Sequence, residues 1–422
     1  MVESDGGPEA RAQENLQRRT LRTLMAGLIP AGAAMTAAYS AAAVLGEELS
    51  GSEMLGGLAA SGLTTGSALA ILPLARLMSR YGRRPGLVAG YTTAAIGTTF
   101  CMLSAITGCY ILLVPGMLGV GAGNAANLAA RFAASDLAPE EGRARAIGTL
   151  VWASTIGAVV GPSIGLGPAK SFAGLLGVSV LAGPYMASTA LFVSAALIVG
   201  RYLRPDPLVV AGGVGGTGTK EGRHLAEAAR SLIGSATGRL AVLSMVVGHI
   251  VMVGVMTMTP LHLRDGDHEL EIIGFVISLH IIGMYACAPV VGWLTDHLGP
   301  LIVLATGGLI LFIGSEMASR TNPEDSLGIF IGLFLIGLGW NFGLISSSAL
   351  LVVEFDGPER VRVQGLADLG MTAAGALAGL GSGVFVTFSG FHTLAHNSAL
   401  IGLFPTVAVI MMVIRSRRPS IR

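Results

Sequence analysis

Long apolar runs and short polar segments alternate along the whole chain. Each run is about twenty residues or longer, which is the length that an α-helix needs to cross the hydrocarbon core of a bilayer. Backbone polar groups cannot stay unpaired in hydrocarbon, so runs of this length are predicted to be helices. Twelve spans are predicted, at 22–45, 54–77, 86–106, 109–133, 146–168, 172–200, 240–262, 271–294, 300–319, 326–353, 362–387 and 393–414.

The polar segment at 201–239 divides these spans into two sets of six. It contains a glycine-rich run, Ala211 to Gly218, of a composition that makes linkers flexible. We therefore predict an all-α polytopic membrane protein with two pseudo-symmetric six-helix bundles. The expected parts are an N-terminal segment at 1–21, bundles at 22–200 and 240–414, the linker at 201–239 and a tail at 415–422. Within the linker, Lys220 to Ser235 are predicted to form a short interfacial helix.

Composition agrees with a membrane protein and narrows its class. Hydrophobic residues make up 52% of the chain and charged residues 12%, about half the charge of a soluble domain. The net charge of +1 gives no reason to expect a nucleic-acid partner. The first 20 residues hold no apolar stretch, so no cleaved signal is expected. Cys101, Cys109 and Cys287 lie in or beside spans and are expected to be free thiols.

The basic residues predict an orientation. With both termini in the cytoplasm, 23 of the 26 Lys and Arg lie on the cytoplasmic side, leaving Lys170, Arg264 and Arg320 outside. Basic residues are enriched in cytoplasmic loops, so a multi-pass protein of the cytoplasmic membrane with N-in and C-in topology is expected. The lipid bilayer is therefore an expected partner of the protein.

A loop segment after the second span recurs, weakly, after the eighth. Ser79 and Asp296 occupy equivalent positions 217 residues apart. Over the whole chain the sequence resembles the major facilitator superfamily, whose loop motif is G-x-L-a-D-r-x-G-r-k. The first copy has Ala75 and Ser79 in place of the Gly and Asp, and keeps the later residues Arg80, Gly82, Arg83 and Arg84. The second copy keeps Gly292, Asp296 and Gly299 and lacks the basic residues. The resemblance implies an alternating-access transporter with no enzymatic activity and no cofactor.

The fifth span contains a second motif, which favours another member of the superfamily. Gly157, Gly161, Pro162 and Gly165 are similar to the G-x-x-x-G-P-x-x-G pattern of its antiporters. Small residues of this kind also serve close helix packing. Pro115 and Leu118 stand where proton-coupled drug exporters carry an intramembrane Arg and Gln, which argues against the exporters that use that Arg. Because of the glycine motif of span five, a proton-coupled multidrug or metabolite exporter is the alternative function, and a membrane sensor or assembly factor is a third.

Methionine and histidine recur at helical spacing in spans seven and eight. Met252 and Met256 lie four residues apart in one span, and His280 and Met284 lie four apart in the next. Residues four apart share a helix face. Thioether and imidazole groups are soft donors that suit Cu(I). Buried methionines more often serve packing alone, and a buried histidine is often only hydrogen-bonded. Met245, His249 and Cys287 extend the two stripes as candidate accessory ligands.

M-x-x-x-M followed by H-x-x-x-M resembles the CcoA-like copper importers of the superfamily, in the same two spans. This resemblance implies uptake of copper ion as substrate, bound by Met252, Met256, His280 and Met284. It also implies delivery to a cytoplasmic copper acceptor and support of haem-copper oxidase assembly. His392 and His396 form a further spaced pair, and the charged cluster from Arg264 to Glu271 is expected to be a solvated loop.

Charged residues at the cytoplasmic ends of spans suggest a gate. Arg80 and Arg83 follow span two, and Asp136 closes span four. One of these arginines is expected to pair with Asp136 when the cytoplasmic side is closed. Asp296 is expected to have the matching role in the second half, near the N-terminus of span eleven or near the end of span ten at Glu354 and Asp356.

Overall fold

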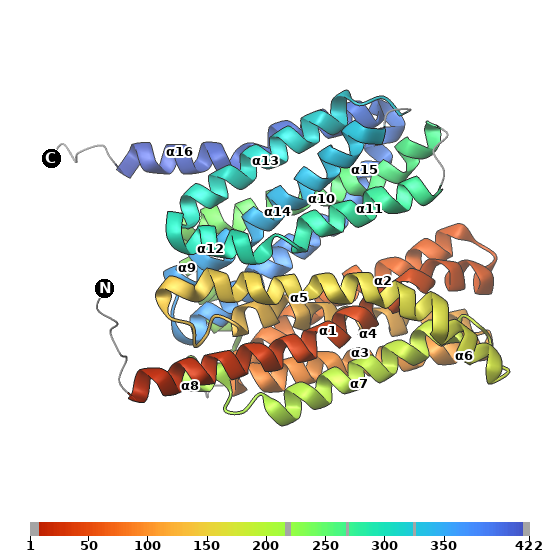
Figure 1. Ribbon diagram of the computed structural model, residues 1–422, viewed down its shortest axis with the longest axis horizontal. Coiled ribbons are helices and arrows are strands. Elements are labelled where there is room, and N and C mark those ends of the chain that lie inside the picture. The colour runs from red at the N-terminus through yellow and green to blue at the C-terminus, as the bar shows by residue number, and fades with distance from the viewer. Residues whose placement is uncertain (1–7, 216–220, 267–269, 324–325, 417–422) are drawn as a thin grey trace. The chain divides into compact units, whose positions relative to one another are not determined.

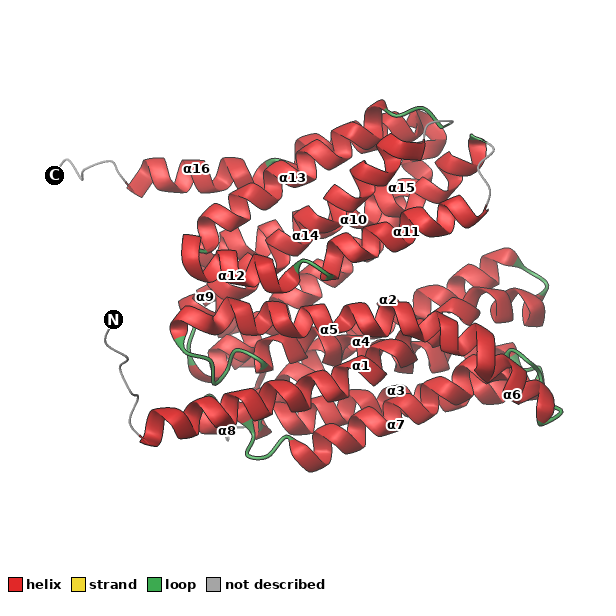
Figure 2. Ribbon diagram, in the orientation of Figure 1, coloured by secondary structure: helices red, strands yellow, loops and turns green. Residues whose placement is uncertain are grey.

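Helices make up most of the chain that the structure describes. The computed structural model describes residues 8–215, 221–266, 270–323 and 326–416, and these ranges contain helices, turns and loops but no strand (Figure 2). The predicted all-α polytopic fold is confirmed. Part of the Arg264–Glu271 cluster lies outside the described residues.

Two units of helices follow one another along the chain. Unit 1 comprises residues 1–219 together with 356–362, and unit 2 comprises 220–355 together with 363–422. The first eight helices are α1 (Pro8–Ser50), α2 (Glu53–Tyr81), α3 (Arg83–Thr107), α4 (Leu113–Ala133), α5 (Arg143–Ile164), α6 (Lys170–Leu175), α7 (Ala182–Tyr202) and α8 (Pro207–Val210). The others are α9 (Glu221–Gly234), α10 (Ala236–Asp265), α11 (Leu270–Tyr285), α12 (Ala288–Leu298), α13 (Pro300–Arg320), α14 (Ser326–Glu354), α15 (Gly357–Gly402) and α16 (Phe404–Ser416).

Eleven stretches within the described ranges are long and apolar enough to cross a membrane. The last of them runs from Gly357 to Arg415 and covers both of the final two predicted spans. Helix α15 is broken at Gly390, whose φ of 79° lies in the left-handed region that only glycine adopts readily. That break falls between the spans predicted at 362–387 and 393–414, so the prediction of twelve crossings agrees with the chain path.

Two predicted spans and the linker differ from the structure in detail. Span six begins at Ala182 rather than at 172, because residues 170–175 form α6, which continues the helical run of span five, and Gly177 turns the chain with a φ of 70°. Span eight is interrupted, since α11 ends at Tyr285 and α12 starts at Ala288, followed by Pro289. The helix predicted within the linker is present as α9, whereas α8 was not predicted.

Close approach of small residues holds unit 1 together. A side chain at Gly121 of α4 would collide with the backbone of α2 at Leu63 and Ser67. Gly97 of α3 and Gly119 of α4 meet in the same way, because an added Cβ on either would lie 2.8 Å from the Cα of the other. Backbones this close are typical of membrane helices, whose association depends on van der Waals packing. Figure 1 shows α1 running beside α5 and α7 in this unit.

Helix α14 is the centre of unit 2. It packs against α10, α11, α12 and α13, whereas α10 and α11 contact each other only slightly (Figure 1). Gly339 of α14 lies against Leu311 of α13, and Gly283 of α11 lies against Phe334 of α14. Side chains of spans seven and eight that point inward therefore meet α14.

Candidate functional site

The methionine and histidine stripe of span seven lies on α10. Ser235 caps this helix by accepting a hydrogen bond from the Gly238 N–H at 2.9 Å, which satisfies one of the free donors of the first turn. Met245 and Met252 are buried in unit 2, and His249 and Met256 are half-buried. The predicted face therefore points largely inward.

His280, near the middle of α11, is fully buried. Its Nδ1 lies 2.7 Å from the carbonyl oxygen of Leu333 on α14. A carbonyl oxygen only accepts, so Nδ1 carries the hydrogen and the lone pair of the neutral ring is on Nε2. Within the described part of the chain, that buried Nε2 has no hydrogen-bond partner. This is the tautomer and the anchoring that metal-binding histidines usually show.

Met284 lies one turn after His280 and is also buried. Asn341 of α14 donates a hydrogen bond from its amide to the Met284 carbonyl oxygen. Gly337, one turn earlier on α14, allows the two helices to approach, because a Cβ there would lie 2.5 Å from the His280 carbonyl oxygen. Leu333, Gly337 and Asn341 thus form one face of α14 that positions His280 and Met284.

His249 has a different environment. Trp340 of α14 donates from its indole Nε1 to His249 Nδ1 at 3.0 Å. The other side of the ring lies against Gly375 of α15, where any side chain would collide with the imidazole. Because Trp340 occupies the Nδ1 lone pair, His249 has the hydrogen-bonded surroundings of a structural core histidine. The Tyr285 ring packs edge-on against Trp340, with centroids 5.9 Å apart.

Cys287 and the pair His392 and His396 were weaker candidates for metal binding. Cys287 does not continue the His280–Met284 face, because α11 has already ended at Tyr285. His392 and His396 each contact α13 instead of each other: His392 Nδ1 is 2.6 Å from the Ser319 carbonyl oxygen, and His396 Nδ1 is 2.9 Å from Glu316. The described ranges contain no group of three or more His, Cys, Asp or Glu that could hold a metal ion. Convergence of Met252 and Met256 with His280 and Met284 stays a prediction.

A buried ionic cluster is present where a gate was predicted. Arg83 donates to Asp136 from Nε at 2.8 Å and from a terminal nitrogen at 3.2 Å, with both side chains almost fully buried. Arg360, at the start of α15, adds a contact of 3.3 Å to the same carboxylate. Arg83 is therefore the arginine that pairs with Asp136. Arg80 is exposed and packs over the Tyr81 ring instead. The role of Asp296, which lies in α12, stays a prediction.

Asp206 joins the loop between α2 and α3 to the segment after α7. Its carboxylate accepts from the backbone N–H groups of Arg83 at 3.1 Å and Arg84 at 2.7 Å, at the start of α3. It also caps α8, accepting from Leu208 at 3.0 Å and Val209 at 3.4 Å. One side chain thus satisfies the first donors of two helices.

The glycine motif of span five serves packing between helices in unit 1. A side chain at Gly157 would press on the backbone of Gly32 and Ala33 in α1, and one at Gly161 would collide with Thr36. Thr36 in turn donates to the Gly157 carbonyl oxygen at 3.1 Å. These contacts explain the small residues without a role in antiport.

Sequence reasoning missed four residues of these sites: Trp340, Asn341, Asp206 and Arg360. A tryptophan and an asparagine inside an otherwise apolar span were a usable signal, since polar groups in a membrane need partners. The sequence Asp-Pro at 206–207 was a second signal, because an acceptor followed by proline marks a helix start. Nothing in the sequence indicates which carboxylate Arg360 contacts.

The chain is similar to transporters over nearly its whole length. The family described as Major Facilitator Superfamily matches residues 24–271 and 266–422. The uncharacterized MFS-type transporter YdeG of Bacillus subtilis (strain 168) is 37% identical over 412 residues, covering 96% of this chain and 93% of YdeG. The riboflavin transporter RfnT of Brucella anthropi is 28% identical over 375 residues, covering 87% of this chain and 88% of RfnT. The fold matches the E. coli fucose:proton symporter FucP with a TM-score of 0.72 at 16% identity, covering 92% of this chain and 97% of FucP.

Proposed function

The chain belongs to the major facilitator superfamily, as a multi-pass membrane transporter and not an enzyme, and we propose that its substrate is copper, carried as Cu(I). The proposed ligands are Met252, Met256, His280 and Met284, brought together in unit 2 during the transport cycle. The proposed direction is import across the cytoplasmic membrane, with N-in and C-in topology. The direction comes from the resemblance to CcoA-like importers, and the topology from the distribution of Lys and Arg.

One observation carries the proposal: the buried Nε2 of His280. Burying a polar ring in the middle of a membrane span costs free energy, and such residues are usually functional. Its Nδ1 is held by the Leu333 carbonyl oxygen, and within the described residues its Nε2 has no partner. Met284 follows one turn later on the same helix face. A neutral imidazole and a thioether arranged in this way suit a soft cation.

The ligand set also fits the needs of a transporter. Three thioethers and one imidazole are neutral, so a bound Cu(I) keeps its charge and can be released. Mg²⁺ and Ca²⁺ need oxygen donors, and Zn²⁺ usually takes cysteine, histidine or carboxylate. Copper would then pass to a cytoplasmic acceptor and support haem-copper oxidase assembly, as the resemblance to the importers implies. The Arg83–Asp136–Arg360 cluster is the proposed cytoplasmic gate.

The second candidate is a flat organic substrate, favoured by the similarity to RfnT. Trp340 and Tyr285 provide an aromatic pair in unit 2 on which a ring system could stack. On this alternative, His280 would hydrogen-bond a polar group of the substrate. The exporter alternative has less support, because the glycine motif of span five is accounted for by packing on α1.

Cellular copper content distinguishes these functions. Deleting the gene should lower the copper content of cells grown on scarce copper, and the wild-type gene should restore it. Excess zinc, nickel or manganese should not compete with uptake, whereas Ag⁺, another soft monovalent ion, should. Unchanged copper together with lost riboflavin uptake would favour the organic substrate, and raised copper would indicate an exporter.

A further inference from the structure

A carboxylate from a distant part of the chain lies beside the incomplete loop motif of the first half. Ser79 occupies the position where the superfamily motif has Asp. The Ser79 hydroxyl donates to the Arg76 carbonyl oxygen, at 3.0 Å. The Gly215 N–H donates to the Ser79 carbonyl oxygen at 3.3 Å, so the segment after α7 folds back on this loop. Asp206 belongs to that segment.

The loop is built to receive the Asp206 side chain. Gly82, between α2 and α3, has a φ of 101°, and an added Cβ would lie 2.5 Å from the Asp206 Cγ. Only glycine combines that conformation with so close an approach. Asp206 then accepts hydrogen bonds from the N–H groups of Arg83 and Arg84. A negative charge at a helix N-terminus is stabilising, and here it fixes the backbone of a gate residue.

We propose that Asp206 replaces the missing acidic residue of the loop motif and acts as a positioning residue for the cytoplasmic gate. It holds the Arg83 backbone so that the guanidinium reaches Asp136 with two hydrogen bonds. Losing Asp206 frees the start of α3 and weakens the closed arrangement of Arg83, Asp136 and Arg360. The proposal rests on the gate being used in transport, and not on the identity of the substrate.

Accessibility of a cysteine beside the cluster tests this role without any substrate. Ser135→Cys places a thiol at a position that is 1% exposed, with Cys109 and Cys287 changed to Ser. Asp206→Ala should raise the rate at which the introduced thiol at position 135 is alkylated by about tenfold. This is the change expected from loss of one helix cap. Adding Ser79→Asp should return the rate to within about twofold of the parent. Asp206→Asn, which keeps an acceptor without the charge, should lie between the two.

The rescue separates positioning from general stability. An unchanged alkylation rate in Asp206→Ala would overturn the proposal, as would failure of Ser79→Asp to reverse a raised rate. If Asp206→Ala does not accumulate, the double variant is the decisive one. Recovery of folded protein on adding Ser79→Asp supports the proposal that Asp206 takes the place of the acidic residue of the motif. Lack of recovery, when Ser79→Asp alone folds normally, contradicts the proposal.

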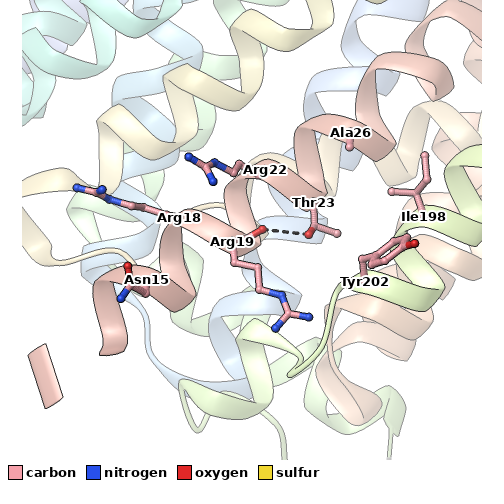
Figure 3. Close-up of a pocket in the computed structure, with 8 residues that line it drawn as sticks. All are labelled: Asn15, Arg18, Arg19, Arg22, Thr23, Ala26, Ile198 and Tyr202. Atoms are coloured by element: carbon pink, nitrogen blue, oxygen red, sulfur yellow. Dashed lines mark hydrogen bonds between the residues drawn. The ribbon is translucent and has the colours of Figure 1, made fainter. Parts of the chain in front are cut away.

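An independent observation concerns a basic groove between α1 and α7 in unit 1. Its cavity of about 560 Å³ is lined by Asn15, Arg18, Arg19, Arg22, Thr23, Ala26, Ile198 and Tyr202 (Figure 3). The α1 residues follow a spacing of three and four, which places them on one helix face. Arg18 pairs with the exposed Glu14 at 2.5 Å, whereas Arg19 and Arg22 have no ion pair among the described residues.

The groove lies where α1 passes from charged to apolar residues. No charged residue occurs between Arg22 and Glu47, so Arg22 stands where α1 becomes apolar. On α7, Ile198 lies one turn deeper than Tyr202, whose half-exposed ring suits the bilayer surface. The groove is therefore basic at the end formed by the arginines of α1 and apolar toward Ala26 and Ile198. We infer that it binds an anionic phospholipid, with the phosphate at Arg19 on the side of Tyr202 and an acyl chain along Ile198 (Figure 3). Arg22, whose guanidinium points to the other side of α1, adds positive charge to the groove.

Native mass spectrometry of the full-length protein with phosphatidylglycerol or phosphatidylcholine tests the inference. Changing Arg19 and Arg22 together to Gln should weaken phosphatidylglycerol binding about 30-fold, as expected from the loss of two positive charges at the groove. The matched control changes Arg230 and Arg415, two exposed arginines outside the groove, and should bind as the parent does. Excess inorganic phosphate should not displace the lipid. Equal losses in both double variants, displacement by phosphate, or equally tight phosphatidylcholine binding would overturn it.

Discussion

His249 and His280 make an instructive pair, because the same sequence signal has two different structural outcomes. Each lies inside an apolar span of unit 2, and each faces α14. His249 accepts a hydrogen bond from the Trp340 indole and lies against Gly375. His280 uses Nδ1 to donate to a backbone carbonyl oxygen, and its Nε2 has no partner in the described part of the chain. The partner supplied by α14 thus decides which nitrogen lone pair is available to a ligand.

The strongest test of this difference is to remove each ring in turn. His280→Gln should abolish copper uptake at normal protein levels, because no other imidazole is available at that position. His249→Gln should retain at least about half of the uptake and lower stability by roughly 1–3 kcal/mol, the cost of an unpaired buried partner. Uptake by cells expressing each variant measures the first effect, and thermal unfolding in detergent measures the second. Equal loss of uptake in the two variants would remove the distinction.

At the proposed ligand positions, the sulfur atom should matter more than the volume of the side chain does. Met284→Leu and Met256→Leu keep a similar size, and such exchanges usually cost less than about 1.5 kcal/mol in stability. Each should nevertheless lower copper affinity about tenfold or more, because a thioether ligand is lost. Met371→Leu, at a buried methionine of α15, is the matched control and should leave affinity unchanged. Competition against a Cu(I) chelator measures all three, and equal affinities would show that these methionines only pack.

Moving His280 without replacing it is a milder change. Gly337→Ala would place a methyl group 2.5 Å from the His280 carbonyl oxygen and 3.2 Å from its Nδ1. The strain of such overpacking is about 1–3 kcal/mol, and uptake should fall several-fold as the ring shifts. Gly343→Ala, on the same helix with open space around it, should be neutral. If both variants transport alike, the position of the His280 ring is not critical.

The smallest effect is expected from freeing His249. Trp340→Phe removes the indole N–H and leaves the His249 Nδ1 without its donor. Copper uptake should stay within about twofold of the parent. A clear rise in copper affinity would mean that His249 becomes an additional ligand once released, which would restore it to the accessory set with Met245. A chelator competition with this variant and with His249→Gln distinguishes these outcomes.

The sequence predicted the fold well because membrane spans obey a simple length and hydropathy rule. It also predicted that Arg80 or Arg83 pairs with Asp136, since the loop motif carries charges at known helix ends, and the structure has Arg83 in that pair. It could not separate His249 from His280, because their partners, Trp340 and Leu333, are more than fifty residues away in the chain. The sequence also did not show that α11 ends at Tyr285, before Cys287, because the end of this helix depends on local geometry that hydropathy does not report. Asp206 was missed for a similar reason, as its contacts are with residues over a hundred positions earlier.

Transport by the purified protein in liposomes tests the central claim most directly. Radiolabelled copper under reducing conditions and riboflavin would be offered separately to vesicles holding the parent, His280→Gln or His249→Gln. The account predicts copper accumulation by the parent and by His249→Gln, none above empty vesicles for His280→Gln, and no riboflavin transport by any of them. Riboflavin transport without copper transport, or full copper transport by His280→Gln, would contradict it.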